Sequence, residues 1–323
     1  MTIAWVIGGG GLLGSALQNA LRRHGTALFV PEMPFDWGDG PLLNEQMAAA
    51  VQAFAEQASG TGQWQIYWAA GVGVMSSADA ALAPETQTLG RLLQLLAAAP
   101  QLMAVPGAIA FASSAGAIYA GARAAIITEQ TAPAPTTAYA RQKLKQEALL
   151  ADFALAHPCL SVLNARISTV YGPGQAAGKQ QGLLTHIARR ILRNQPIQIY
   201  VPYDTIRDYI AVDDAAGAMV GALALAGRQP GVCTKIIASE HPTTIAEIIA
   251  VFRRIARRAP LVVTSASKLS NLYARRVQFR SVVLTNAARP MATSLAVGIA
   301  RLMVAERAAF VRSSPKCAAC AIV

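Results

Sequence analysis

Apolar residues in the first half of the chain fall into two alternating patterns. Short continuous apolar runs have the length of buried strands and occupy residues 2–7, 27–30, 65–70, 108–112 and 160–167. Helical spacing of apolar residues fills most of the intervals, at residues 12–23, 45–58, 85–99 and 137–156. Strands that alternate with helices predict an α/β fold with a parallel sheet covered on both faces.

Beyond about residue 175 the alternation loosens. Three amphipathic helices with basic residues are predicted there, at residues 183–194, 245–258 and 294–311. We therefore expect a first domain over residues 1–175 and a smaller C-terminal part over 176–312, which interleaves with the first domain near 205–220. Residues 313–323 are expected to form a tail.

The longest uncharged stretch, between Arg91 and Arg123, is not expected to cross a membrane. It contains Pro100, Pro106 and several glycines, whereas a spanning helix needs about 20 predominantly apolar residues with internal backbone hydrogen bonds. The pattern instead indicates the end of a helix, a turn and a buried strand. Because the N-terminus also lacks the basic segment of a signal peptide, we expect a cytoplasmic location.

Charge is spread unevenly along the 323 residues, which carry a formal net charge of +11 and are 54% hydrophobic. So high an apolar content excludes intrinsic disorder as the main state. Residues 1–122 hold 3 basic and 7 acidic side chains, whereas residues 123–323 hold 25 and 10. The basic second half indicates an anionic partner, either a phosphorylated substrate, a membrane surface or nucleic acid, with a merely solvated basic face as the alternative.

Residues typical of metal sites are too scattered to predict one. The four histidines, at positions 24, 157, 186 and 241, lack metal-ligand spacing. Cys317 and Cys320 form a single CxxC pair in the tail without a second pair, and the last four residues match a prenylation signal only formally. We therefore expect no metal, and a tail without a zinc site or a lipid anchor.

A glycine-rich segment between the first predicted strand and the first predicted helix is a candidate anion site. Gly8, Gly11 and Gly14 have the spacing GxxGxxG, which permits a tight turn, and the helix N-terminus offers free N–H groups to a pyrophosphate. Dinucleotide sites of this kind usually have an acidic residue after the second strand, which binds the ribose. Glu32 and Asp36 are the candidates here.

The same region favours NAD over NADP. A 2′-phosphate needs a basic partner, and residues 24–90 contain neither Lys nor Arg. Arg22 and Arg23, at the end of the first predicted helix, keep NADP open. Because the segment after the second strand is short for a complete second helix, we expect residues 35–37 to form a third strand, with Asp36 near the adenine.

Tyr139 and Lys143 form a YxxxK pair on the predicted helix 137–156, where residues four apart share a face. The Lys ammonium can lower the pKa of the neighbouring phenol, so that the phenol acts as acid and base. Ser114 ends the preceding strand, where its hydroxyl can hold the reacting oxygen of a substrate. Each signal alone has an ordinary alternative, a chance pairing on a helix or a serine bonded to local backbone.

Six ordered motifs together resemble the extended short-chain dehydrogenase/reductases, the NAD-dependent epimerase/dehydratase family. They are GxxGxxG at 8–14, Ala-Ala at 69–70, Ser-Ser…Ile-Tyr at 113–119, YxxxK at 139–143, Val-Tyr-Gly-Pro at 170–173 and Arg-Asp-Tyr-Ile…Val-Asp-Asp at 207–214. The resemblance is close over residues 2–214 and rests on helix pattern alone over 215–311.

The resemblance implies a Rossmann-type doubly wound sheet that binds NAD(H), with a smaller C-terminal α/β domain that binds a nucleotide-sugar rather than nucleic acid. It implies that Tyr139 is the catalytic acid/base, Lys143 its pKa partner and Ser114 the catalytic hydroxyl. The residues expected at the cofactor are Gly8, Gly11, Leu12, Leu13, Gly14, Glu32, Asp36, Ala69, Ala70, Gly71, Tyr139 and Lys143. Those expected at the substrate are Ser114, Thr169 and Arg207, with Arg207 on the diphosphate and Thr169 where relatives usually have Asn. A homodimer is expected through the helices near 85–99 and 137–156.

Two departures from the family pattern bear on the reaction. The catalytic hydroxyl of many relatives lies four residues before the tyrosine of the strand-end motif; counting back from Tyr119 gives Ala115, whereas counting back from Tyr139 favours Ser114. Sugar dehydratases carry an Asp-Glu pair just after that hydroxyl. This chain has Gly116 and Ala117 there, so dehydration is disfavoured.

The sequence therefore predicts an NAD(H)-dependent nucleotide-sugar epimerase or keto-sugar reductase that acts by hydride transfer with a Tyr/Lys acid–base pair. Two alternatives stay open: a reductase of a non-sugar ketone on the same fold, and a non-catalytic NAD-binding regulator, which Ala115 motivates. The basic residues between Arg253 and Lys316 exceed what one diphosphate needs, and peripheral contact with an anionic membrane face is their most economical explanation.

Overall fold

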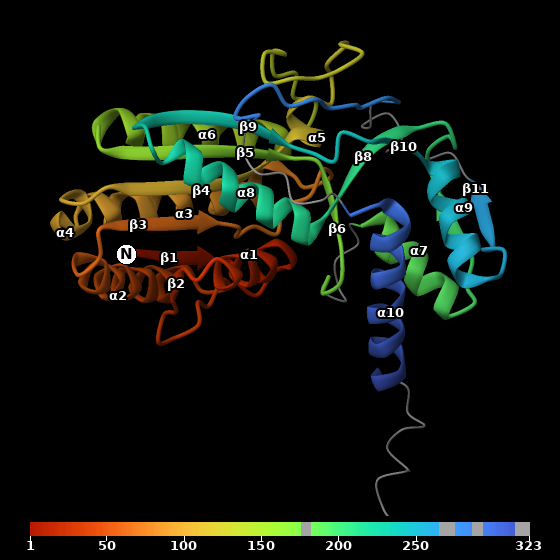
Figure 1. Cartoon of the computed structure of the whole chain (residues 1–323), viewed down its shortest axis with the longest axis horizontal. Coiled ribbons are helices and arrows are strands. Elements are labelled where there is room, and N and C mark those ends of the chain that lie inside the picture. Colours follow the sequence, from red (N-terminus) through yellow and green to blue (C-terminus); the bar gives the residue numbers. More distant parts are fainter. Residues whose placement is uncertain (176–181, 265–274, 286–292, 314–323) are drawn as a thin grey trace, which may run out of the picture.

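A six-stranded parallel sheet forms the centre of the larger part of the molecule. In the computed structural model, which describes residues 1–175, 182–264, 275–285 and 293–313, its strand order is β2-β1-β3-β4-β5-β9 (Figure 1). The strands are β1 Thr2–Ile7, β2 Ala27–Phe29, β3 Gln63–Trp68, β4 Gly107–Ser114, β5 Leu160–Ile167 and β9 Gly231–Ile237. The predicted α/β fold with a Rossmann-type parallel sheet is confirmed.

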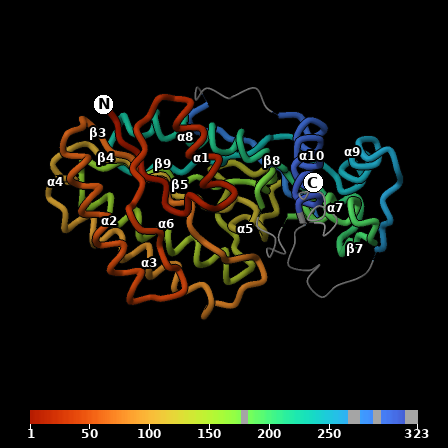
Figure 2. The backbone as a smooth tube through the Cα atoms, turned by 90° about the horizontal axis from the view of Figure 1, so that it is seen from below, coloured from red at the N-terminus to blue at the C-terminus, as the bar shows by residue number. Residues whose placement is uncertain are grey.

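Helices cover both faces of this sheet (Figures 1 and 2). One face carries α1 Leu12–Arg23 and α8 Val212–Ala226, which pack against each other. The other face carries α2 Gly40–Ser59, α3 Asp79–Ala97 and α6 Ala138–Ala156. Two short helices, α4 Pro100–Met103 and α5 Ala115–Ile118, flank β4 in the sequence. The uncharged stretch after Arg91 is thus the end of α3, then α4 and the buried strand β4.

The hydrophobic core lies on both faces of the sheet. Between the sheet and α2 the largest buried side chains are aromatic, and the rings of Trp5 and Phe54 have centroids 5.4 Å apart. The buried Trp64 indole donates from Nε1 to the Leu102 carbonyl at 2.8 Å, which offsets the cost of removing that N–H from water. Smaller residues such as Ala216 fill the opposite face under α1 and α8.

The expected third strand at residues 35–37 is wrong. These residues lie in the loop between β2 and α2, and β2 forms the edge of the sheet. Phe35 packs its ring against Trp5 at 6.2 Å, so its burial is side-chain packing and not strand pairing. Asp39 then caps α2, because its side chain accepts a hydrogen bond from Leu42 N at 3.0 Å. The second helix is therefore complete, at 20 residues.

The C-terminal part is built on two small sheets beside the carboxyl ends of the large one (Figure 1). Its elements are β6 Thr169–Tyr171, α7 Leu183–Leu192, β7 Ile197–Ile199, β8 Ile206–Ala211, β10 Pro242–Thr244, α9 Ile245–Ala256, β11 Val262–Thr264 and α10 Leu295–Ser313. Strands β10, β8 and β6 pair in one sheet, and β11 pairs with β7 in the other. Between β8 and β10 the chain returns to the large sheet through α8 and β9.

The core of this part is formed by α7, α9 and α10, around Phe252 and Leu302.

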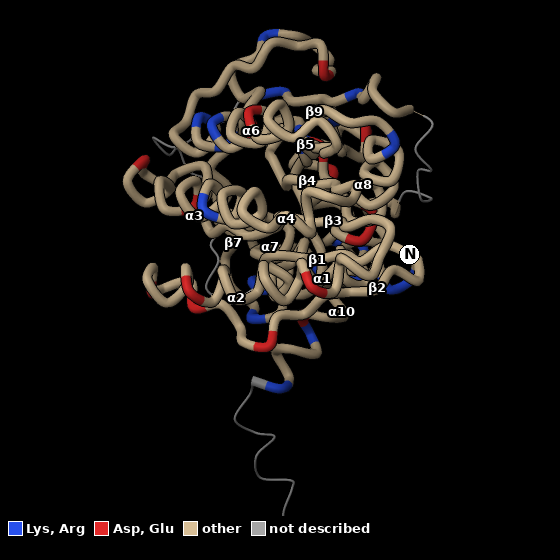
Figure 3. The backbone as a smooth tube through the Cα atoms, turned by 90° about the vertical axis from the view of Figure 1, so that its left-hand side faces the viewer, with Lys and Arg blue, Asp and Glu red and all other residues tan. Residues whose placement is uncertain are grey.

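No helix among the described residues is long and apolar enough to cross a membrane. Charged residues are sparse along the chain, as Figure 3 shows. The CxxC pair of the predicted tail lies outside the described residues.

Candidate active site

The glycine loop lies where the strand order of the large sheet reverses. From β1 the chain moves outward to β2, and β3 then pairs on the other side of β1. Open α/β sheets bind their ligands outside the carboxyl ends of the strands at such a point, here β1 and β3. Gly8–Gly14 follows β1, and Ala69–Gly71 follows β3.

Close backbone packing explains two of the loop's glycines. Gly8 has φ +86°, and a Cβ there would lie 2.6 Å from Ala70 N. A Cβ at Gly14 would lie 2.1 Å from the Gly8 carbonyl oxygen, so α1 could not approach the loop so closely with any side chain there. Gly11 begins α1 without a side-chain cap, and Gly10 and Gly11 are exposed. Free N–H groups at an exposed helix start suit a pyrophosphate, so these residues fit a dinucleotide.

The expected ribose ligands lie beyond β2. Glu32 and Asp36 are both exposed in the loop between β2 and α2. Asp36 accepts a hydrogen bond from Gly38 N at 2.9 Å, so one of its oxygens already holds the turn. Arg22 and Arg23 are exposed at the end of α1, where the Arg22 guanidinium contacts Asn19 Oδ1 at 3.2 Å.

Ser114, Tyr139 and Lys143 come together at the carboxyl end of β4. Tyr139 and Lys143 lie one turn apart near the start of α6, which Thr137 caps by accepting a hydrogen bond from Ala140 N at 3.2 Å. Lys143 Nζ lies 5.8 Å from the centre of the Tyr139 ring and 4.8 Å from that of Phe111. The Ser114 hydroxyl lies close enough to the Tyr139 phenol to lower its pKa. Of the two positions that sequence counting offered for this hydroxyl, Ala115 is fully buried in the core.

Burial controls the protonation of the pair. Burial, with a smaller contribution from the Glu85 carboxylate, raises the pKa of Tyr139 to about 12, and the neighbouring Ser114 hydroxyl acts in the opposite direction. Burial lowers the pKa of Lys143 to about 8, although the carboxylates of Glu85 and Glu147 favour its charged form. In the protein alone, the phenol is therefore protonated at neutral pH and the amine titrates just above it.

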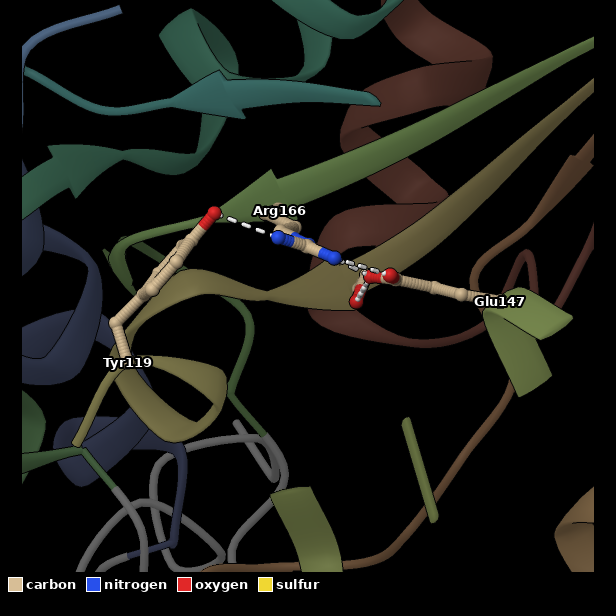
Figure 4. A network of polar contacts seen from close by, with 4 residues as sticks. Tyr119, Glu147 and Arg166 are labelled. Atoms are coloured by element: carbon tan, nitrogen blue, oxygen red, sulfur yellow. Dashed lines mark hydrogen bonds and ion pairs between the residues drawn. The ribbon is translucent and has the colours of Figure 1, made fainter. Parts of the chain in front are cut away.

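A buried network of hydrogen bonds and an ion pair lies next to Tyr139 and Lys143 (Figure 4). Glu147, one turn beyond Lys143 on α6, accepts from Arg166 Nη2 at 2.6 Å and from Arg166 Nε at 3.0 Å. The other side of the guanidinium donates from Nη1 to the Tyr119 phenol at 2.6 Å. Ser113 donates to Glu147 Oε1 at 2.6 Å. The network ties α6 to β4 and β5, and so fixes the helix that carries Tyr139.

The residues expected at the substrate lie on the three-stranded sheet. Thr169 is exposed at the start of β6 and pairs in register with Tyr209 of β8. Arg207, two residues before Tyr209, is half-buried and donates from Nη1 to the Ile206 carbonyl at 2.8 Å. Neighbouring strands thus bring Thr169 and Arg207 to one sheet.

Sequence reasoning missed two carboxylates of this site. Glu147 follows Lys143 by four residues, so the spacing YxxxKxxxE could have placed it on the same helix face. Glu85 was expected only as the first residue of a helix, but α3 begins earlier, at Asp79. Glu85 instead accepts hydrogen bonds from Val72 N and Gly73 N, both at 2.7 Å. No local pattern signals that contact.

Comparison with known families gives a match over most of the chain. The family described as the NAD dependent epimerase/dehydratase family matches residues 4–233. A dTDP-L-rhamnose 4-epimerase of Burkholderia thailandensis is 36% identical over 98 residues, which are 30% of this chain and 26% of that protein. A dTDP-4-dehydro-6-deoxyglucose reductase of Escherichia coli is 31% identical over 121 residues, 38% of either chain. The chain thus spans only about a quarter to two fifths of these curated relatives.

Solved structures share the whole fold. The UDP-glucose 4-epimerase of Thermus thermophilus in complex with NAD superposes with a TM-score of 0.78, at 20% identity, over 96% of this chain and 100% of that one. RMD from Pseudomonas aeruginosa, complexed with NADPH, superposes with a TM-score of 0.77 at 22% identity, over 95% of this chain and 100% of that one. At these identities the likeness concerns the fold.

Proposed function

The chain belongs to the NAD-dependent epimerase/dehydratase family, and we propose that it is an NAD(H)-dependent nucleotide-sugar epimerase or keto-sugar reductase. One observation carries this proposal. Ser114, Tyr139 and Lys143 converge at the carboxyl end of β4, on the same edge of the sheet as the glycine loop after β1. A hydroxyl, a phenol and an amine in this order are the groups that an alcohol–ketone interconversion needs.

Each residue has a separable role. The Ser114 hydroxyl holds the reacting oxygen of the sugar beside the Tyr139 phenol, which gives up or takes the proton. Lys143, when charged, favours the phenolate of Tyr139 and binds the ribose of the dinucleotide. A bound nicotinamide supplies the acceptor or donor of hydride. Thr169 and Arg207 bind the far part of the substrate, with Arg207 at the diphosphate.

We propose NAD rather than NADP as the dinucleotide. Glu32 and Asp36 follow β2, where an acidic side chain binds the ribose hydroxyls and repels a 2′-phosphate. The two relatives of known structure above carry NAD in one case and NADPH in the other. Arg22 and Arg23 are the residues through which NADP would bind.

Dehydration is not part of this proposal. Gly116 and Ala117, which stand where dehydratases carry the Asp-Glu pair, have no proton-transfer group. These two positions therefore supply no acid for the elimination of water. A non-sugar ketone reductase remains the second candidate, because it requires the same three residues but not Arg207.

The assembly and location are further parts of the proposal. We place the enzyme in the cytoplasm, as a homodimer through the outer faces of α3 and α6. The leucines of α3, including Leu89, Leu92 and Leu96, are fully buried within one subunit, so the contact must use other residues of the helix. Light scattering that gives the mass of one chain would exclude the dimer.

The surplus positive charge has a candidate surface on α9. A hollow of about 720 Å³ is lined by apolar residues such as Ile249 and by Arg253, Arg254, Arg257 and Arg258, which are all exposed. Four guanidinium groups around an apolar floor suit an anionic lipid surface. Sedimentation with anionic vesicles, lost in high salt and in the variant with these arginines changed to Gln, is the expected result. Equal sedimentation with neutral vesicles would contradict it.

The central proposal is tested by Tyr139→Phe together with ligand binding. Nucleotide-sugars that bear UDP, GDP or dTDP are screened with NAD and NADP by thermal shift, and the pair that shifts the melting temperature is assayed for turnover. Turnover should be lost at least about 100-fold in Tyr139→Phe, because general acid–base catalysis contributes about 10²–10⁴-fold, while NAD binding persists. A shift with dinucleotide alone would favour the regulator, and wild-type turnover in the variant would exclude the mechanism.

A further inference from the structure

The turn that follows β3 is held by a single carboxylate. Glu85, half-buried in the second turn of α3, accepts at Oε1 from the backbone N–H groups of Val72 and Gly73, both at 2.7 Å. Its Oε2 lies 3.1 Å from where a Cβ at Gly71 would be, and Gly71 has φ +150°. One side chain thus binds two consecutive backbone N–H groups shortly after β3 and lies close to a third residue, Gly71.

The same turn lies against the Tyr139 ring. A Cβ at Gly73 would lie 3.3 Å from Glu85 Oε1 and 3.3 Å from Tyr139 Cδ2. It would also lie 2.4 Å from Cδ2 of the buried Leu82, whose side chain would have to shift. Gly73 therefore lies between the Glu85 carboxylate and the Tyr139 ring. The charge of Glu85 acts on both catalytic groups, because it favours the protonated forms of Tyr139 and of Lys143.

We propose that Glu85 is a positioning residue of this site, which holds the turn Gly71–Gly73 against Tyr139 and places a negative charge next to the Tyr139–Lys143 pair. The inference rests on the proposed function, because Tyr139 and Lys143 are the groups that it serves. It assigns two separable tasks to one side chain: two accepted hydrogen bonds, which shape the turn after β3, and one charge, which favours the protonated forms of Tyr139 and Lys143.

Two substitutions separate these tasks. Glu85→Gln keeps a carbonyl oxygen that can accept from Val72 N and Gly73 N, but it removes the charge. Glu85→Ala removes both. Asp79→Asn is the matched control, because Asp79 lies on the same helix, contacts α6 through Gln142 Nε2 at 3.2 Å, and is exposed.

The shaping task is measured by the dissociation constant of NAD in the otherwise unmodified protein. We expect Glu85→Ala to weaken binding about tenfold, as the loss of one to two net hydrogen bonds predicts. Glu85→Gln and Asp79→Asn should bind NAD within about threefold of the wild type. Unchanged binding in Glu85→Ala would overturn the shaping task. Absence of NAD and NADP binding in the wild type would instead overturn the proposed function.

The charge is measured without any cofactor, through the titration of Lys143. Reductive methylation with ¹³C labels the six lysines of the chain, and the NMR signal of Lys143 is the one that Lys143→Arg removes. Its titration midpoint should lie near pH 8 in the wild type. Glu85→Gln should move it down by about one pH unit, because the neighbouring anion is gone, while Asp79→Asn should leave it in place. Coincident curves for wild type and Glu85→Gln would overturn the role of the charge, whatever the protein binds.

Discussion

Two carboxylates flank the Tyr139–Lys143 pair, and they are held in opposite ways. Glu147, below the pair, is buried and forms a two-pronged ion pair with Arg166, with further hydrogen bonds at each end of the network. Glu85, beside the pair, is only half-buried and is held by backbone N–H groups. The first charge is paired with a full positive charge and holds α6 in place, although it also favours the charged form of Lys143. The second has amide dipoles in place of a full positive charge, so more of its field reaches Tyr139.

The largest effect should come from breaking the buried pair. Glu147→Ala leaves the Arg166 guanidinium buried without its counter-charge, and we expect the free energy of unfolding to fall by about 3–5 kcal/mol. Glu85→Ala frees two N–H groups that water can reach, so it should cost only about 1 kcal/mol. Denaturant unfolding of both variants measures the contrast.

A double variant separates lost charge from lost packing at Glu147. Glu147→Ala combined with Arg166→Met keeps the same loss of volume at position 147 but removes the unpaired cation, so it should be more stable than Glu147→Ala alone. If the double variant is as unstable as the single one, then packing and not charge accounts for the loss, and the contrast between the two carboxylates fails.

The next effect concerns the pH dependence of stability. The pKa of Lys143 is about 8 in the folded protein against 10.5 for an ordinary lysine. Below pH 8 the amine is charged in both states, so the cost of burying it is present in full. As the pH rises from 8 toward 10.5, the folded protein releases this proton while the unfolded chain keeps it, so stability increases by up to about 3 kcal/mol.

Lys143→Met isolates this contribution. The variant should be more stable than the wild type at pH 7, and the difference should shrink as the pH rises toward 9.5. Other alkaline groups titrate in both proteins and cancel in the comparison. A difference that stays constant with pH would mean that the folded protein does not depress the pKa of Lys143.

How much of this site the sequence could predict depends on how far apart the partners lie in the chain. Tyr139 and Lys143 were predictable because they lie one helical turn apart. The strand 160–167 was predictable because it is a continuous apolar run, and the structure has it as β5. Ser114 was placed by counting from Tyr139, and its hydroxyl lies close enough to that phenol to lower its pKa. In each case the signal is local.

The missed features depend on contacts across the fold. Arg166 contacts Glu147 because β5 pairs with β4 beneath α6. The two residues lie 19 positions apart in the sequence, and no sequence pattern indicates their contact. Glu85 was hidden by a misplaced helix start, since Pro84 reads as a helix boundary but here lies inside α3. Residues 35–37 were predicted as a strand because the segment after β2 looked too short for a complete second helix, whereas α2 begins directly after this loop, at Gly40.

The smallest contrast uses two adjacent serines. Ser113 points to Glu147 and Ser114 to Tyr139, so neighbouring hydroxyls on β4 serve the structural and the chemical side of the site. Ser113→Ala should lower the free energy of unfolding by about 1–3 kcal/mol, because it removes a buried hydrogen bond to a charged group, and should leave turnover nearly intact. Ser114→Ala should do the reverse, with a stability change of at most about 1 kcal/mol, since its hydroxyl otherwise only caps the four-residue α5 at 3.4 Å. Chemical denaturation and turnover measured on the same two variants decide the matter: if Ser113→Ala loses turnover as fully as Ser114→Ala, then the buried network takes part in setting the acid–base pair and cannot be counted as support for the helix alone.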